Sequence, residues 1–105
     1  MEFKYRRAPA IYRTISSIDN IKDIRVRLLG KVVEKMNGSI IFEDYSGKTE
    51  IIIDNYIVES LNIGETIRIF CRVMQLDNGR ELRAELIQDM NNMDRELYEK
   101  IFEKA

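Results

Sequence analysis

The chain has 105 residues, 45% of them hydrophobic and 33% charged, a composition that predicts one soluble globular domain rather than a disordered segment. Histidine is absent and Cys71 is the one cysteine, so the commonest general base and the usual zinc ligands are missing. No apolar run approaches the ~20 residues of a membrane span. We therefore expect a binding module rather than an enzyme, with no cofactor, no metal ion and no membrane contact.

Residues 1–21 form the least regular stretch of the sequence. Isoleucine recurs at Ile11, Ile15, Ile18 and Ile21, a spacing that suits a short helix, while nearby Thr and Ser residues favour an extended segment equally. We expect these side chains to plug one end of the following domain, with a partner-facing role as the alternative. The basic and aromatic residues near the N-terminus are either a phosphate-binding cluster or a solvated tail.

The next stretch predicts three strands joined by two tight turns. Residues 23–35 alternate between apolar and charged side chains, which is the period of a strand with one buried face. Gly30 lies within this long strand, and a residue without a side chain there favours a bulge or a sharp coil. Asn37-Gly38 is the pair best suited to a type I′ hairpin turn. It leads into strands over residues 39–44 and 48–54.

A short helix is expected over residues 55–61, with Ile57 and Leu61 in the core. Residues 65–75 then give the strongest strand pattern in the chain. Its inward face is predicted to hold Ile67, Ile69, Cys71 and Val73, and its outward face Arg68, Phe70, Arg72 and Met74.

A second Asn-Gly pair, Asn78-Gly79, predicts another hairpin and a fifth strand over residues 81–88, with Leu82, Ala84 and Leu86 facing inward. Five strands, a glycine in the first and a cap between the third and fourth favour an all-β oligonucleotide-binding (OB) barrel. A generic antiparallel meander is the alternative. We assign residues 1–90 to this barrel domain, with 1–21 as its lead-in.

Residues 91–105 predict a C-terminal α-helix appended to the barrel, with acidic residues in its first turn and lysines near its end. Its apolar stripe either packs on its own barrel or meets helices of other chains, and we favour oligomerisation. The predicted partner-binding residues are Met93, Leu97, Tyr98, Ile101 and Phe102.

The charge distribution points to a nucleic-acid surface. Net charge is −1, but residues 1–35 carry nine basic and four acidic residues, so positive charge is concentrated around the first strand. Phe70 between two arginines on an outward face is typical of single-strand binders, which stack bases and contact phosphates. Packing of Phe70 and Met74 against a partner subunit or the C-terminal helix is an equal alternative. The predicted nucleic-acid-binding residues are Arg25, Arg27, Lys31, Lys35, Tyr45, Lys48, Tyr56, Arg68, Phe70, Arg72 and Arg80.

Several segments together resemble the middle subunit of replication protein A, the eukaryotic and archaeal heterotrimer that binds single-stranded DNA. They are Pro9 with Ile15-Ser-Ser-Ile18, the strand over residues 24–33, the turn over residues 43–48, and residues 82–91 entering the final helix.

The resemblance implies protection of single-stranded DNA in replication, repair and recombination, with the C-terminal helix joining a bundle with other subunits. It also implies that bases stack near Tyr56 and at Met74, but Met74 has no aromatic ring on which a base could stack. The long N-terminus and separate C-terminal domain of the eukaryotic subunit have no counterpart, which favours a compact archaeal version or a small-subunit-like role. We expect a cytoplasmic, nucleoid-associated location if the source is archaeal and a nuclear one if it is eukaryotic.

Two other functions stay open at the level of sequence. The near-neutral net charge and the lack of tryptophan favour an assembly subunit whose barrel holds a complex together without touching nucleic acid. The second open function is that of an RNA- or transfer-RNA-binding barrel, because the fold alone does not determine which nucleic acid is bound.

Overall fold

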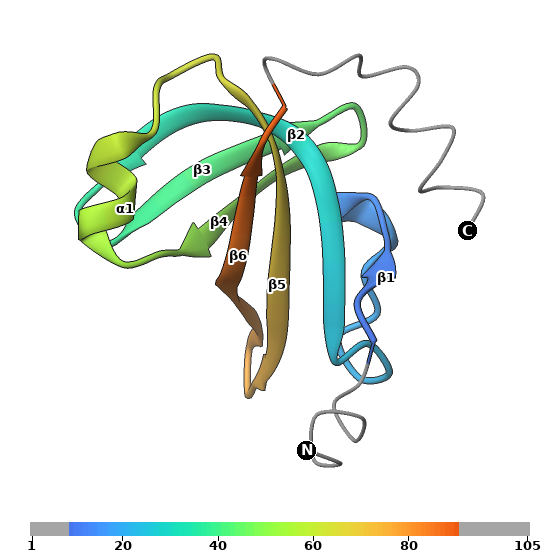
Figure 1. The fold of residues 1–105 in the computed structure, drawn as a ribbon. Coiled ribbons are helices and arrows are strands. Elements are labelled where there is room, and N and C mark those ends of the chain that lie inside the picture. The colour runs from blue at the N-terminus through green and yellow to red at the C-terminus, as the bar shows by residue number, and fades with distance from the viewer. Residues whose placement is uncertain (1–8, 91–105) are drawn as a thin grey trace, which may run out of the picture.

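In the computed structural model, which describes residues 9–90, strand β2 (Arg25–Met36) has two neighbours on its way across the molecule (Figure 1). Its first half pairs antiparallel with β5 (Thr66–Leu76), and its second half pairs antiparallel with β3 (Ser39–Asp44). Lys31 is paired in both directions. One long strand thus belongs to both sides of the sheet, which is what a barrel needs in order to close.

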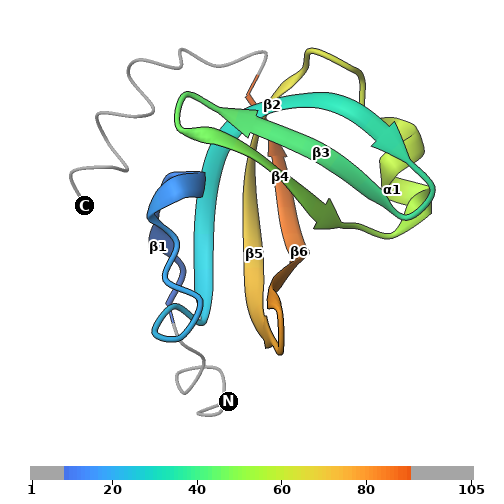
Figure 2. The same cartoon turned by 180° about the vertical axis from the view of Figure 1, so that it is seen from behind.

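The remaining strands complete the circuit. Strand β4 (Gly47–Ile52) pairs antiparallel with β3 and parallel with β6 (Gly79–Asp89), and β6 pairs antiparallel with β5. The order β2-β3-β4-β6-β5 returns to β2, and the short helix α1 (Asn55–Ser60) lies between β4 and β5 (Figure 2). This confirms the predicted five-stranded OB barrel and excludes the open meander. The predicted C-terminal helix over 91–105 lies outside the described residues.

The lead-in packs along the barrel. Strand β1 (Ile11–Tyr12) runs parallel to β2 and is followed by a 3-10 helix (Ile15–Ser17). Ile15 and Ile18 are buried in the core, as predicted, whereas Ile11 and Ile21 are exposed. The predicted isoleucine plug is therefore right for two of the four side chains.

Two bulges set which side chains face the core. On β2 the register shifts at Val33, whereas Gly30 is paired regularly, so the bulge predicted as one option at the glycine lies three residues later. On β6 the extra residue is Glu85, because the pairing passes directly from Ala84 to Leu86. A bulge of one residue reverses the facing of everything beyond it. Leu86 is consequently 51% exposed, and its predicted inward position is wrong.

The first hairpin turn differs from the predicted type I′. That type needs positive φ at both central residues, and within residues 9–90 only glycines have positive φ. Gly38 has φ of 86°, while Asn37 keeps a negative value. The turn is held from outside the hairpin, because the amide of Gly38 donates to Asn55 Oδ1 at 3.1 Å and its carbonyl accepts from the amide of Ile53 at 3.0 Å.

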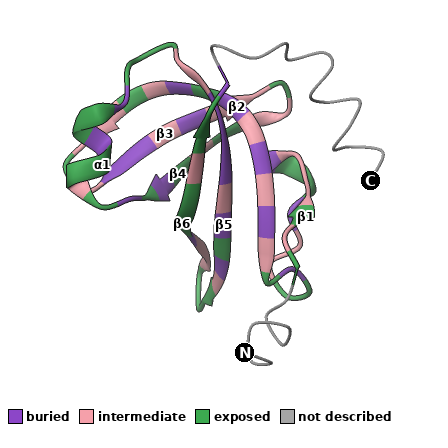
Figure 3. Ribbon diagram, in the orientation of Figure 1, coloured by how far each residue is buried: buried purple, intermediate pink, exposed green. Residues whose placement is uncertain are grey.

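Buried and exposed residues alternate along the barrel strands (Figure 3). Cys71 and its three apolar neighbours on the inward face of β5 are buried as predicted. Arg68 lies on the outward face with Phe70, as predicted, but it is buried there, at 8% exposure. Helix α1 buries Val58 rather than the predicted Ile57, which is 40% exposed. Leu61 is buried as predicted.

Candidate nucleic-acid interface

Within residues 9–90, the two most exposed aromatic side chains lie at opposite ends of the β3–β4 hairpin. Tyr45 is 90% exposed in the turn that joins the two strands, close in sequence to the exposed Lys48. Tyr56 is 83% exposed on α1, which follows the far end of β4 (Figures 1 and 2). The structure therefore does not bring these two rings together, and neighbouring bases cannot stack on both.

Two of the predicted phosphate contacts have structural partners. Lys35 Nζ donates to the carbonyl oxygen of Leu61 at 2.7 Å, which satisfies a backbone group at the end of α1. Arg80 donates through a terminal nitrogen to Asn20 Oδ1 at 2.9 Å and so links the β5–β6 hairpin to the lead-in. Both cations therefore hold loops of the barrel in place.

The outer face where β2, β5 and β6 run side by side gathers most of the other predicted residues. Directly opposite residues share a face, so the register sets one row of Arg27, Phe70 and Leu86 across the three strands. A second row beside it consists of Arg25, Arg72 and Arg83. Lys31, on the same strand as Arg25, is exposed farther along β2.

The ring of Phe70 is held by Arg68. The guanidinium carbon of Arg68 lies 4.7 Å from the ring centroid, within the range of a cation–π contact. Burial lowers the pKa of Arg68, and the nearby charge of Arg27 lowers it further, although an arginine stays protonated. Phe70 itself remains partly exposed. The ring thus offers a stacking surface beside concentrated positive charge.

The outer arginines of the second row are paired with glutamates. Arg25 donates from Nε and a terminal nitrogen to the two oxygens of Glu85, at 2.8 and 3.1 Å, in a fork-like ion pair that spans β5. Arg83 is paired with Glu81 on its own strand. Arg72, between them, is exposed and has no ion-pair or hydrogen-bond partner within residues 9–90.

Sequence reasoning left Arg83 out of the predicted site. Its side chain is 59% exposed, and it lies opposite Arg72 on one side and Ile52 on the other. The available signal was its outward position on the fifth predicted strand.

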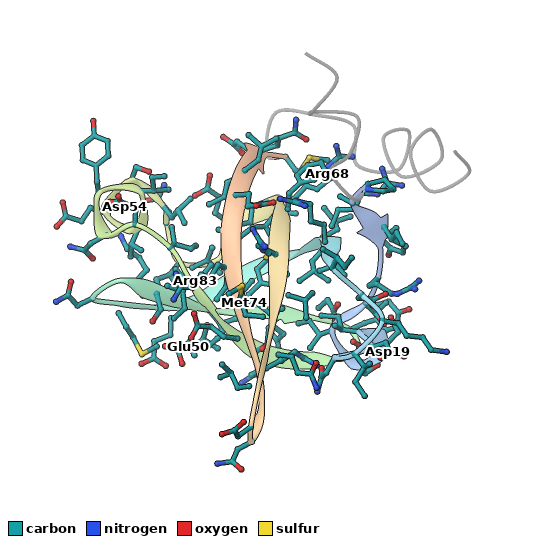
Figure 4. All side chains as sticks on the ribbon, turned by 90° about the horizontal axis from the view of Figure 1, so that it is seen from below. Asp19, Glu50, Asp54, Arg68, Met74 and Arg83 are labelled. Carbon is teal, nitrogen blue, oxygen red and sulfur yellow. The ribbon has the colours of Figure 1, made fainter. Side chains whose placement is uncertain are left out.

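The surface between the two Asn-Gly hairpins, where this fold usually places its ligand, holds an exposed acidic side chain. Glu50 and Arg83 lie near one another with Met74 close by (Figure 4). Glu50 is exposed, and its Oε2 accepts a hydrogen bond from Ser39 Oγ at 2.7 Å. A carboxylate at this position repels phosphate, and a thioether provides no ring for stacking. The β2–β5–β6 face carries the ring of Phe70 with arginines beside it, so we place the candidate interface there.

The predicted partner-binding residues Met93, Leu97, Tyr98, Ile101 and Phe102 all lie outside the described residues. Over residues 9–90, none of the helices has the length and apolar character needed to cross a bilayer. In that same part of the chain, no three acidic or cysteine side chains are grouped as metal ligands would be.

Comparisons with known proteins support the fold. No protein-family model matches the chain, and no curated protein sequence is detectably similar to it. Among solved structures, the Stn1–Ten1 complex of S. pombe has a chain that matches with a TM-score of 0.66 and 23% identity, over 92% of this chain and 91% of that one.

Two further structures are similar. The second OB-fold domain of replication protein A from Methanococcus maripaludis gives a TM-score of 0.59 and 16% identity, over 80% of this chain and 99% of that one. The hypothetical protein ygiW from E. coli gives a TM-score of 0.63 and 24% identity, over 76% of this chain and 90% of that one. At these identities the likeness establishes the OB fold, which hosts several functions.

Proposed function

We propose that this chain is a single-stranded-DNA-binding OB-fold subunit of a replication protein A-like complex that acts in DNA replication, repair and recombination. The observation that carries the proposal is the β2–β5–β6 face, where the partly exposed ring of Phe70 is flanked in register by Arg27 and lies beside the row that contains Arg72. Rings and arginines together are the means by which proteins bind single strands without sequence preference.

The same face predicts weak binding by the isolated chain. Stacking on one ring contributes roughly 1–3 kcal/mol per base, and Phe70 is the one ring in these two rows. Two of the arginines already have carboxylate partners. A complex with further subunits would add contacts and raise affinity through effective concentration.

Fluorescence anisotropy with a labelled oligo-dT at low salt tests the proposal. Replacing Phe70 by leucine removes the ring and keeps apolar bulk, so affinity should fall by at least about fivefold. Tyr56→Leu is the matched comparison, because this ring is the other predicted stacking position and is exposed on α1. A larger loss of affinity in Tyr56→Leu than in Phe70→Leu would place the stacking on α1 instead. Absence of binding by the wild-type chain, alone and in its reconstituted complex, rules out the DNA role. Stronger competition by a matched RNA oligomer would instead favour an RNA-binding barrel.

An assembly subunit that does not touch DNA is the second candidate. The fork-like Arg25–Glu85 pair favours it, because this pair neutralises a cation that DNA would otherwise use. Substituting Leu97 and Ile101 by glutamate in the full-length chain places charge on the predicted helical stripe. We expect these changes to abolish association with partner subunits and to leave the DNA affinity of the isolated chain unchanged. Light scattering of the reconstituted complex measures the first effect and anisotropy the second.

A further inference from the structure

The second row on the β2–β5–β6 face contains three arginines directly opposite one another. Arg25 pairs with Arg72 across β2 and β5, and Arg72 pairs with Arg83 across β5 and β6. Like charges placed directly opposite on neighbouring strands destabilise a sheet. Three in succession oppose folding, and the core lies on the other face of these strands. A row of this kind is therefore a candidate for binding anions.

Glutamates reduce the repulsion within this arginine row only in part. Glu85 neutralises Arg25 with both carboxylate oxygens, and Glu81 neutralises Arg83. The central Arg72 keeps its full charge and its exposure. The five side chains together carry a net charge of about +1 at neutral pH. An approaching polyanion can first bind the available guanidinium of Arg72. It can then displace the glutamates from the guanidiniums of Arg25 and Arg83.

We propose that the arginine row is a track for the phosphate backbone of single-stranded DNA and that Glu85 and Glu81 are internal anions which the phosphates displace. This inference rests on the proposed function. It adds that the two glutamates neutralise part of the binding surface when DNA is absent. The planar fork of arginine binds phosphate in the same bidentate way in which Arg25 binds Glu85. Phosphates therefore replace the glutamate without any change in the barrel backbone.

The position of Phe70 favours a nucleic acid over an acidic peptide. Phe70 precedes Arg72 by two residues on the same face of β5, a separation of roughly 7 Å along the strand. A nucleotide can place its phosphate on Arg72 and its base on the ring. An acidic peptide would satisfy the guanidiniums and leave the ring without a stacking partner.

Oligo-dT anisotropy on full-length variants over a range of salt concentrations tests the arginine row. Arg72→Gln should lower affinity about fivefold at 0.1 M salt and reduce the slope of log Kd against log salt by about 0.7, the loss of one phosphate contact. Lys22→Gln, which removes the same charge from the exposed lead-in turn, should change neither. Glu85→Gln should raise affinity by a similar factor and steepen the slope, because Arg25 becomes available. Glu59→Gln, on exposed α1, is its control.

The outcomes separate the arginine row from the proposed function. If the wild-type chain binds DNA but Arg72→Gln changes affinity and salt slope no more than Lys22→Gln does, the arginine row does not bind phosphate. The proposed function is then unaffected. If Glu85→Gln gains no more affinity than Glu59→Gln, displacement of the carboxylate is overturned. If polyglutamate displaces labelled oligo-dT as well as unlabelled oligo-dT does, the row binds acidic peptides instead. If no variant and no wild-type chain binds DNA, the function and the row fail together.

Discussion

A Cβ atom on Gly30 would lie 2.2 Å from the backbone carbonyl oxygen of Glu43. It would also lie 2.9 Å from Cζ of Phe42, a side chain that is fully buried. Strands β2 and β3 approach this closely next to Lys31, where β2 pairs on both sides. Closure of the barrel therefore depends on the absence of a side chain at Gly30.

Gly30→Ala should destabilise the protein by about 3 kcal/mol, because the obstructing atom belongs to the backbone and cannot move like the end of a side chain. Gly47→Ala is the matched control. A Cβ there would meet only Ile15 Cγ2 at 3.9 Å, an ordinary contact, so we expect a change below about 1 kcal/mol. Urea denaturation followed by circular dichroism measures both. Equal stability of the two variants would contradict the close-approach argument.

The barrel could be predicted from sequence because its signals are local. Strand alternation, Gly30 and the two Asn-Gly turns each lie within a few residues of the feature that they specify. Which side chains of β6 face the core beyond residue 84 could not be predicted from local signals, because Leu86 and Ile87 are both apolar and each suits a buried position. Pairing with β5 and the bulge at Glu85 decide that Ile87 rather than Leu86 faces the core, and no local pattern indicates this bulge.

A pair of lysine substitutions tests that register. Leu86→Lys should cost less than about 0.5 kcal/mol, because Leu86 is half exposed on the outer face. Ile87→Lys should cost several times more, about 2–3 kcal/mol, because Ile87 packs against the core cluster. Chemical denaturation gives both values. The reverse order would mean that β6 continues without a bulge.

The candidate site was less predictable than the fold. Arg25 is separated from its partner Glu85 by 60 positions, so no local pattern indicates that this cation is neutralised. Strict alternation predicts the outward face for Arg68 correctly, but it does not indicate that the side chain is buried and stacks on Phe70. Which arginines stay available depends on cross-strand neighbours, and these follow only from the closed barrel.

Cys71 should be inert in the folded protein. Burial raises the pKa of its thiol to about 12, with a smaller contribution from the nearby charge of Glu85. The thiolate is the reactive form, so almost none is present at pH 8. We expect no reaction with a thiol-specific chromogenic reagent under native conditions and one equivalent after unfolding in guanidinium. A fast native reaction would show that β5 opens readily or that the thiol is accessible.

The lead-in is fastened by a carboxylate with little exposure. Asp23 accepts hydrogen bonds from Nε and a terminal nitrogen of Arg13, at 3.0 and 3.2 Å, and from the amide of Asp19 at 2.9 Å. The hydrogen bond from Arg13 is the main cause that lowers the pKa of Asp23. The side chain of Arg13 is one-third exposed, so water weakens this pair. Asp23→Asn should therefore cost about 1–2 kcal/mol at pH 7.

The pH dependence of that loss tests the ionised state of Asp23. Because its pKa is lower in the folded than in the unfolded chain, Asp23 contributes its full stability above the unfolded value of about 4. The contribution disappears as the pH falls through the lower, folded value. The gap in unfolding free energy between wild type and Asp23→Asn should thus be constant from about pH 7 to 5 and narrow below about pH 4. Asp77→Asn, in the exposed β5–β6 turn, serves as the control for a general charge effect. A gap that stays constant down to about pH 2 would show that hydrogen-bond geometry rather than charge fastens the lead-in.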